Sequence, residues 1–280
     1  MLSVIIPSRN EHFLDNTIRD VLKNATGEIE VLPVLDGYDT PHIQDPRVRY
    51  VLLPPAKHTQ KRHGINRAVA EARGTYVMSL DAHCMVAPGF DTQLVQDHHP
   101  DWVQVPRRHR LDAENWCLQP QSDNRPPIDY EYIMFDKLVK YKNIHGYKWD
   151  VKTLERMHIP IDETMQFQGS CWFMTKDWFH TMGLMQISGY SGWGQEAEEI
   201  GMKTWRAGGK VMTNKNTWYA HLHKGPKYGR MYFMSRQSMR DCNTYSYNYW
   251  VHENKEFFVP FINKFQPPLW PENWEEIVYA

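Results

Sequence analysis

Asp81 and His83 lie two residues apart at the end of a short apolar run, Tyr76 to Leu80, and together offer a carboxylate oxygen and an imidazole nitrogen. The run follows Gly74 and is typical of a buried β-strand. Alternate residues of an extended chain point to the same side, so both side chains would face one way. Such ligands suit a divalent cation, although an acid at a strand end is also a common turn cap.

The composition excludes several classes of protein. Of the 280 residues, 41% are hydrophobic and 23% are charged, and the formal net charge is −1. These values argue against a polybasic binder but leave room for a local basic patch. No run approaches the ~18 apolar residues of a membrane span.

The four cysteines are scattered, without the spacing of a zinc site or a disulfide framework. The strand pattern begins at Leu2, which leaves no room for a signal peptide. We therefore expect a cytoplasmic protein with reduced thiols and no membrane partner.

The first ninety residues alternate between apolar runs and helical patterns. Helices are predicted over residues 13–22 and 60–73, and strands over residues 2–7, 29–35, 48–53 and 76–80. This order predicts an α/β fold with an open, mostly parallel sheet flanked by helices. Polar residues follow the strands at Ser8 to Glu11, at Asp36 and at Asp81, where such sheets bind ligands. Neither a glycine-rich dinucleotide motif nor a P-loop follows the first strand.

The alternation weakens after residue 90. A strand is predicted over residues 102–105, and residues 112–165 are interpreted as loops with a short helix at 132–141 that build an acceptor pocket. Another strand is expected at 169–174 and a helix before Gly208-Gly209. No repeat or linker divides the chain, which indicates a single large domain.

Several motifs now form a recognisable set. They are Val4-Ile5-Ile6-Pro7 with Asn10-Glu11, Arg62-His63-Gly64, Asp81-Ala82-His83-Cys84, Trp193-Gly194-Gln195-Glu196 with Trp205 and Gly208-Gly209, and His221, twelve residues past Gly209. Together they resemble family-2-type glycosyltransferases of the GT-A (Rossmann-like) fold, and in particular polypeptide N-acetylgalactosaminyltransferases. The resemblance covers about residues 3 to 225. It implies a catalytic domain over 1–225, with a nucleotide-sugar-binding half (1–110) and an acceptor-side half (111–225), and a C-terminal extension over 226–280 that packs on it.

The resemblance also implies a mechanism, in which a sugar moves from a nucleoside diphosphate sugar, a UDP-sugar in this family, to a hydroxyl. Asp81, His83 and His221 would bind Mn²⁺ or Mg²⁺, which would neutralise charge on the leaving diphosphate. Glu196 would be the general base of an inverting enzyme or would position substrate in a retaining one. The nucleotide-sugar would contact Pro7, Asn10, Glu11, Asp36, Arg62, Asp81 and Trp193.

The chain departs from this family at several positions. Leu35-Asp36 stands where two adjacent acids are usual, Gln195 replaces a glycine, and Ala197-Glu198 follows the key glutamate. We expect neither a membrane anchor before the domain nor a lectin domain after it, and hence no mucin-type secretory role.

The acceptor stays open at this point between a glycan, a protein hydroxyl and a hydroxymethylated DNA base, which would have to be flipped into the pocket. The run Arg107-Arg108-His109-Arg110 is either a solvated face or a phosphate-contacting patch. Two other functions would use the same residues: a phosphohydrolase of nucleotide sugars and a non-catalytic nucleotide-sugar-binding module.

Overall fold

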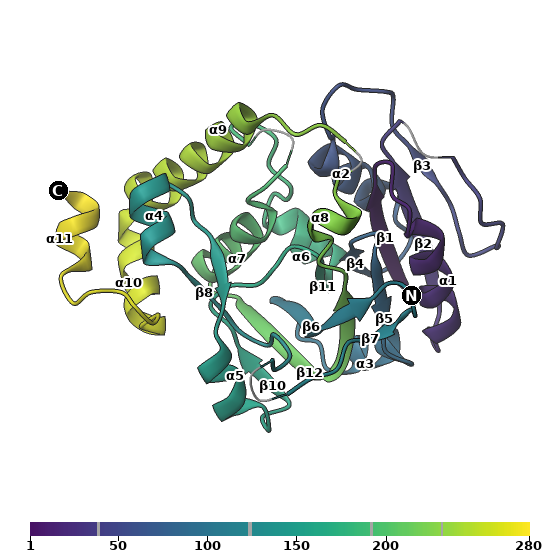
Figure 1. Ribbon diagram of the computed structural model, residues 1–280, viewed down its shortest axis with the longest axis horizontal. Helices are drawn as coiled ribbons and strands as arrows, with labels where there is room; N and C mark the ends of the chain where they lie inside the picture. The colour runs from purple at the N-terminus through teal and green to yellow at the C-terminus, as the bar shows by residue number, and fades with distance from the viewer. Residues whose placement is uncertain (38–39, 123–124, 191–192, 231) are drawn as a thin grey trace.

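A ten-stranded sheet runs through the protein in the order β10-β12-β6-β11-β4-β1-β2-β3, with β5 paired to β12 and β7 paired to β6 (Figure 1). The computed structural model describes residues 1–280 apart from 38–39, 123–124, 191–192 and 231. Helices flank the sheet, so the predicted α/β fold with one large open sheet is confirmed.

The first half of the sheet is parallel. Its members are β1 (Leu2–Ser8), β2 (Ile29–Leu35), β3 (Val51–Leu52) and β4 (Tyr76–Leu80). They are connected through α1 (Leu14–Asn24) and α2 (Lys61–Glu71). All of β2 is buried, as its near-continuous apolar sequence requires of a central parallel strand. The carboxyl ends of β1, β2 and β4 therefore open on the same edge.

The second half of the sheet is mixed rather than parallel. β6 (Trp102–Asp112) runs parallel to β12 (Lys210–His221), whereas β11 (Cys171–Thr175) is antiparallel to β4 and β6. The short strands β5 (Cys84–Val86), β7 (Cys117–Leu118) and β10 (Ile161–Glu163) also pair antiparallel. The end of β12 lies between β5 and β6, so His221 is opposite Cys84 on one side and Arg110 on the other.

Residues 112–165 contain more regular structure than the sequence predicted. β8 (Glu131–Ile133) and β9 (Gly146–Lys148) form a separate two-stranded sheet, and α4 (Phe135–Tyr141) and α5 (Asp150–Arg156) adjoin it. The remaining helices are α3 (Phe90–Gln96), α6 (Lys176–Thr181), α7 (Glu196–Arg206), α8 (Gly225–Tyr228), α9 (Arg236–Tyr247), η1 (Asn248–Glu253), α10 (Lys255–Phe265) and α11 (Trp274–Tyr279).

Two principal hydrophobic cores result. The larger one surrounds the sheet, and the second joins the 132–165 region to the C-terminal helices through Tyr132, Ile133, Trp250, Phe258 and Trp274. In Figure 1 these helices lie beside α4, at the end of the molecule opposite the N-terminus. The domain boundary at residue 225 stays a prediction. None of the helices in the described ranges has the length and apolar composition needed to span a bilayer.

Candidate metal centre and adjoining cavities

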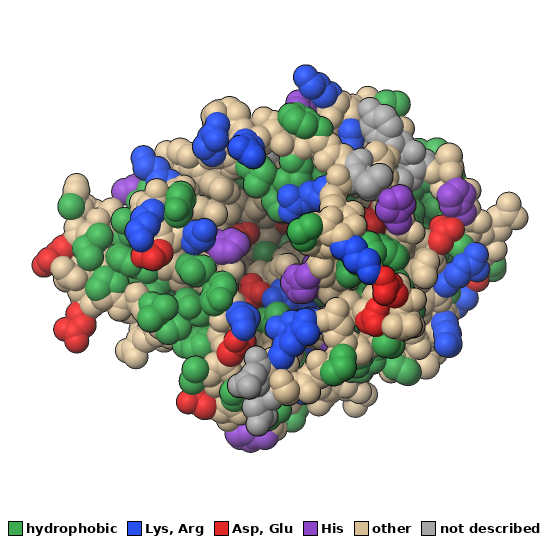
Figure 2. All heavy atoms as spheres, in the orientation of Figure 1, with side chains coloured by type: hydrophobic (Ala, Val, Ile, Leu, Met, Phe, Trp, Pro, Cys, Tyr) green, Lys and Arg blue, Asp and Glu red, His purple; other side chains and the backbone are tan. Residues whose placement is uncertain are grey.

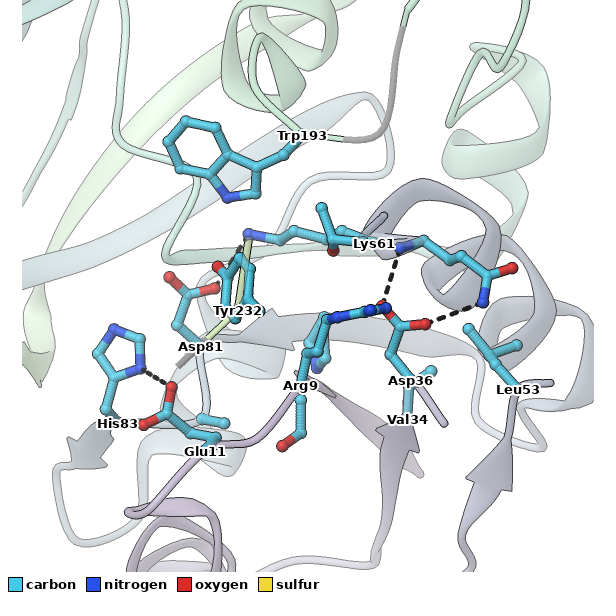
Figure 3. Close-up of a pocket in the computed structure, with 15 residues that line it drawn as sticks. Arg9, Glu11, Val34, Asp36, Leu53, Lys61, Asp81, His83, Trp193 and Tyr232 are labelled. Atoms are coloured by element: carbon cyan, nitrogen blue, oxygen red, sulfur yellow. Dashed lines mark hydrogen bonds and ion pairs between the residues drawn. The ribbon is translucent and has the colours of Figure 1, made fainter. Parts of the chain in front are cut away.

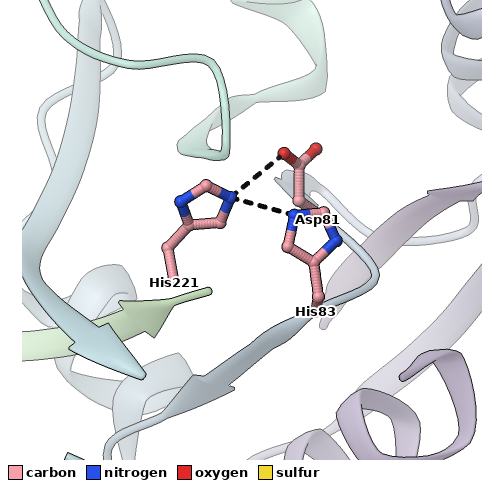
Figure 4. A group of neighbouring side chains, drawn as sticks. All are labelled: Asp81, His83 and His221. Carbon is pink, nitrogen blue, oxygen red and sulfur yellow. Dashed lines mark hydrogen bonds and ion pairs between the residues drawn. The ribbon is translucent and has the colours of Figure 1, made fainter. Parts of the chain in front are cut away.

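Three side chains from two distant segments converge at the carboxyl edge of the sheet (Figure 4). Asp81 follows β4, His83 lies in the turn before β5, and His221 ends β12. His221 Nε2 is 3.1 Å from His83 Nε2 and 3.6 Å from Asp81 Oδ2. Possible ligand atoms of all three lie within 4.8 Å of one another, close enough to share one ion. The β5–β12 pairing creates this arrangement, because it brings the end of β12 against the Asp81–His83 turn.

The chemistry of these donors fits a divalent cation. Glu11 Oε2 lies 3.2 Å from His83 Nδ1, so the other nitrogen of this ring is directed toward His221. Burial lowers the pKa of His221 to about 3, which keeps the ring neutral as a metal ligand must be. A carboxylate behind a metal-binding histidine is the usual support for such a ligand. Burial opposes ionisation of Asp81, but Lys61 and the two imidazoles hold its pKa well below the usual range.

Cys84, the last residue of the motif, has a different role. It is fully buried in β5, and burial raises its pKa well above the ordinary value, so the thiol stays protonated. It is a core residue beside the centre rather than a ligand.

A pocket at the strand ends adjoins the metal centre (Figure 3). This strand-end pocket is lined by Pro7, Ser8, Arg9, Glu11, Val34, Asp36, Leu53, Thr59, Gln60, Lys61, Asp81, Ala82, His83, Trp193 and Tyr232. Five of the seven predicted nucleotide-sugar contacts are therefore among its lining residues. Asp36 accepts from Arg9 Nη1, from the Gln60 backbone N–H and from Gln60 Nε2, each at 2.9 Å.

The other two predicted contacts are placed elsewhere. Asn10 has φ 52° and is not a lining residue. Arg62 is 2% exposed and forms a buried ion pair with Glu199. Its guanidinium also donates to Gln186 O at 3.2 Å and to Gly194 O at 3.0 Å. Arg62 thus ties α2 to the segment that carries Trp193, beneath the pocket rather than in it.

Lys61, the neighbour of Arg62, faces the pocket instead. Its Nζ lies 3.1 Å from Asp81 Oδ1, below the ring of Trp193 in Figure 3. Tyr232 reaches the same pocket from the C-terminal part of the chain. Neither residue was predicted as a site residue. For Lys61 the missed signal was its place at the first turn of a helix that begins beside the strand ends.

A second, wide cavity of about 750 Å³ shares Lys61, Asp81 and Trp193 with the strand-end pocket. Glu196 and Glu198, at the start of α7, line it. Glu196 is 6% exposed, and its Oε1 accepts from the Gly194 N–H at 3.0 Å. Burial, together with the charges of Glu196 and Glu131, raises the pKa of Glu198 to about 8.

The family-specific departure at Gln195 has a structural explanation. Gln195 adopts φ 60°, a conformation that favours glycine, and its Nε2 donates to Asn143 Oδ1 at 3.1 Å and to Ile144 O at 2.9 Å. These bonds connect the start of α7 to the 131–165 region. A glycine would adopt this backbone conformation without strain, whereas the glutamine side chain adds two hydrogen bonds that stabilise the turn.

The basic run in β6 is divided between two faces. Arg108 and Arg110 line the wide cavity, whereas Arg107 pairs with Asp129 and His109 packs against Trp218. Alternate strand residues face opposite sides, so the four cannot form one continuous patch. Arg108 is also neutralised by Glu131 at 2.7 Å.

The chain is similar in sequence to several N-acetylgalactosaminyltransferases. It is 28% identical over 177 residues to a putative polypeptide N-acetylgalactosaminyltransferase 13 of Drosophila melanogaster, covering 58% of this chain and 28% of that protein. It is 24% identical over 237 residues to the human polypeptide N-acetylgalactosaminyltransferase 10, covering 79% of this chain and 38% of that one. The chain spans well under half the length of these relatives.

Solved structures show the same fold. A structure of GalNAc-T7 with UDP, GalNAc and Mn²⁺ superposes with a TM-score of 0.72 at 16% identity, over 95% of this chain and 56% of that one. A structure of S. aureus TarS 1–349 with UDP-GlcNAc gives a TM-score of 0.51 at 11% identity, over 99% of this chain and 83% of that one. The sequence profile described as glycosyl transferase family 2 matches residues 3–183. With this match over more than half of its length, the chain belongs to glycosyl transferase family 2.

Proposed function

We propose that the protein is a metal-dependent glycosyltransferase that moves a sugar from a UDP-sugar to a hydroxyl acceptor. The observation that carries the proposal is the position of the Asp81–His83–His221 cluster, at the junction of two cavities. One cavity lies at the strand ends, where open α/β sheets bind nucleotides. The other offers Glu196 to a second substrate. A binding module or a hydrolase would not need the second, wide cavity.

Asp81, His83 and His221 are proposed to hold Mn²⁺, with Mg²⁺ as the alternative. Mixed oxygen and imidazole donors favour manganese, and a structure of the same fold contains UDP and Mn²⁺. The ion would neutralise the charge that develops on the departing diphosphate. Glu11 would keep the His83 ring in the orientation that presents Nε2.

The strand-end pocket is proposed as the donor site. Pro7 and Asp36 would contact the base or ribose, Lys61 would contact a phosphate, and Trp193 would pack beside the sugar. Arg62 would act on the donor indirectly, through the segment that it holds, and Asn10 through its lining neighbours Arg9 and Glu11. This assignment places donor binding mainly in residues 1–110.

Glu196 is proposed to act on the acceptor hydroxyl in the wide cavity. If the configuration inverts, Glu196 removes the hydroxyl proton; if it is retained, Glu196 positions the substrate. Residues 111–225 would supply most of the acceptor site, and residues 226–280 would support it through the second core. A hydroxymethylated DNA base, a glycan or a protein hydroxyl would each present a suitable nucleophile.

The proposal can be tested by incubating the protein with labelled UDP-sugars, Mn²⁺ and a panel of these three acceptors. We expect transfer that EDTA abolishes and Mn²⁺ restores. Glu196→Gln should lower kcat about 10²- to 10⁴-fold if Glu196 is the base, with UDP binding unchanged. Glu256→Gln, an exposed first-turn acid of α10, is the matched control. UDP release at the same rate with and without acceptor would instead identify a hydrolase.

A further inference from the structure

The wide cavity distributes its charges unevenly. Glu196 and Glu198 lie at the start of α7, while Arg110 and Arg125 belong to β6 and to the segment that follows β7. In Figure 2 a central hollow shows acidic side chains within it and Lys, Arg and His side chains around it. A substrate that spans the cavity therefore meets acids at one part and cations at another.

The two arginines differ from the other cations near the cavity. Arg108 pairs with Glu131, and Lys148 pairs with Asp150. Arg110 donates to Pro126 O at 2.8 Å and Arg125 to Gln119 Oε1 at 2.7 Å, and neither has a carboxylate partner within the described ranges. Burial and the positive charges of Arg125 and Arg108 lower the pKa of Arg110, so an anion between these groups would relieve repulsion.

The position of Arg110 relative to the metal centre limits where such an anion lies. Arg110 is paired with His221 across the β6–β12 ladder, and neighbouring strands are ~4.8 Å apart. An anion bound by Arg110 would therefore belong to the same residue of a polymeric acceptor as the reacting hydroxyl, or to an adjacent one. Trp193 and the 43%-exposed ring of Tyr147 also line the cavity and offer planar faces.

We propose that the acceptor is a polynucleotide whose backbone phosphate binds Arg110 and Arg125 while a hydroxyl-bearing base reaches the metal centre. Guanidinium groups beside aromatic rings are the usual combination for binding a single strand or an extruded base. The net charge of −1 makes this a local site rather than a general affinity for polyanions. This inference rests on the proposed glycosyltransferase function and specifies its substrate.

Binding and transfer can be measured separately. Binding can be followed by fluorescence anisotropy of a labelled single-stranded oligonucleotide that contains 5-hydroxymethyluracil. We expect Arg125→Gln to weaken the affinity about tenfold, and the double variant with Arg110→Gln and Arg125→Gln to weaken it further. Loss of two phosphate contacts should also reduce the slope of log K against log salt by about 1.4. Arg67→Gln, on the exposed face of α2, should leave binding unchanged. Calorimetric titration with UDP and Mn²⁺ should give the wild-type affinity for every variant.

Three results would overturn the inference. The first is that the double variant binds the oligonucleotide with wild-type affinity. The second is that Arg67→Gln loses as much oligonucleotide affinity as the double variant does. The third is sugar transfer to a glycan, peptide or polyol phosphate but not to the oligonucleotide. Failure to transfer sugar to any acceptor, with arginine-dependent oligonucleotide binding intact, would reject the glycosyltransferase function instead. Arg125 is exposed, and within the described ranges its guanidinium bonds to the Gln119 side chain, so its variant reports on binding even where Arg110→Gln unfolds the protein.

Discussion

The strand-end pocket and the wide cavity meet at Lys61, Asp81 and Trp193, yet their charges are organised in opposite ways. In the strand-end pocket, Asp36 is held by Arg9 and Gln60, and Glu11 lies between His83 and Lys224. In the wide cavity, Arg110 and Arg125 form no ion pair with an acid among the described residues, and Glu198 has a pKa raised to about 8. The first site is organised by contacts within the fold, and we propose that Arg110 and Arg125 of the second gain a counter-charge from the substrate.

The largest expected effect comes from removing a metal ligand where the two regions meet. His221→Ala should lower sugar transfer about a thousandfold, or roughly 4 kcal/mol, because the leaving diphosphate loses its counter-charge. Steady-state assays with Mn²⁺ varied would measure it. His99→Ala, an imidazole that is 62% exposed, should keep wild-type activity. Equal losses in both variants would separate the activity from the metal centre.

The buried link between the two regions should dominate stability. Glu199 is fully buried and bonds to Arg62, Lys203 and the Gln186 N–H, so Glu199→Gln removes the carboxylate that pairs with two buried cations and leaves only the charge of Glu196 to act on Arg62. We expect a loss of about 3 kcal/mol in the free energy of unfolding, measured by urea titration. Asp136→Asn breaks an exposed i,i+4 pair with Lys140 and should change nothing measurable. An unchanged midpoint for Glu199→Gln would show that the link is dispensable.

A smaller effect tests whether the strand-end pocket is preorganised. Glu11→Gln should weaken Mn²⁺ binding about 10- to 100-fold, because the amide orients the His83 ring less strongly than the carboxylate. Calorimetric titration with Mn²⁺ would measure it, with Glu114→Gln as the control for loss of a surface ion pair to lysine. Wild-type affinity in Glu11→Gln would mean that the ring is held by packing alone.

The smallest effect concerns Glu198, an acid of the wide cavity. The folded-state pKa of Glu198 is about 8, above the unfolded value of 4.5, so its contribution to stability is complete below the unfolded pKa and is lost as pH rises through about 8. Glu198→Gln removes this loss. Between pH 6 and pH 7, the free energy of unfolding of the variant should rise relative to that of the wild type by at most about 1.4 kcal/mol, measured by urea titration. Parallel stability curves would contradict the raised pKa.

The Asp81–His83–His221 cluster could be predicted from the sequence because its residues belong to motifs with fixed spacing. The role of Arg62 could be carried over only from the motif, yet the helical pattern already argued against a pocket position. Ile65 and Val69 lie on the buried face of α2, and Arg62 shares that face at i−3 and i−7. Lys61, one residue away, turns toward the strand ends. The helical period therefore predicts a buried Arg62, whereas the motif implied a position in the pocket.

The short strands of residues 131–163 could not be predicted in the same way. β8, β9 and β10 are three residues each, too short to show a period, and they are held by pairing with distant segments. The same limit applies to β5, whose pairing with β12 brings His221 to Asp81. Only the alternation within β6 carried usable information, since it predicts that Arg108 and Arg110 share a face.

The second hydrophobic core has a consequence for how this protein can diversify. It joins Tyr132, Ile133 and Met165, near the wide cavity, to Trp250 and Phe258 of the C-terminal helices. A change that remodels the 131–165 region must therefore preserve its packing against the helices from residue 236 onward, or be accompanied by changes in them. The half built around β1, β2 and β4 keeps a core of its own. Grafting experiments between relatives should exchange the two distant segments together, as one unit.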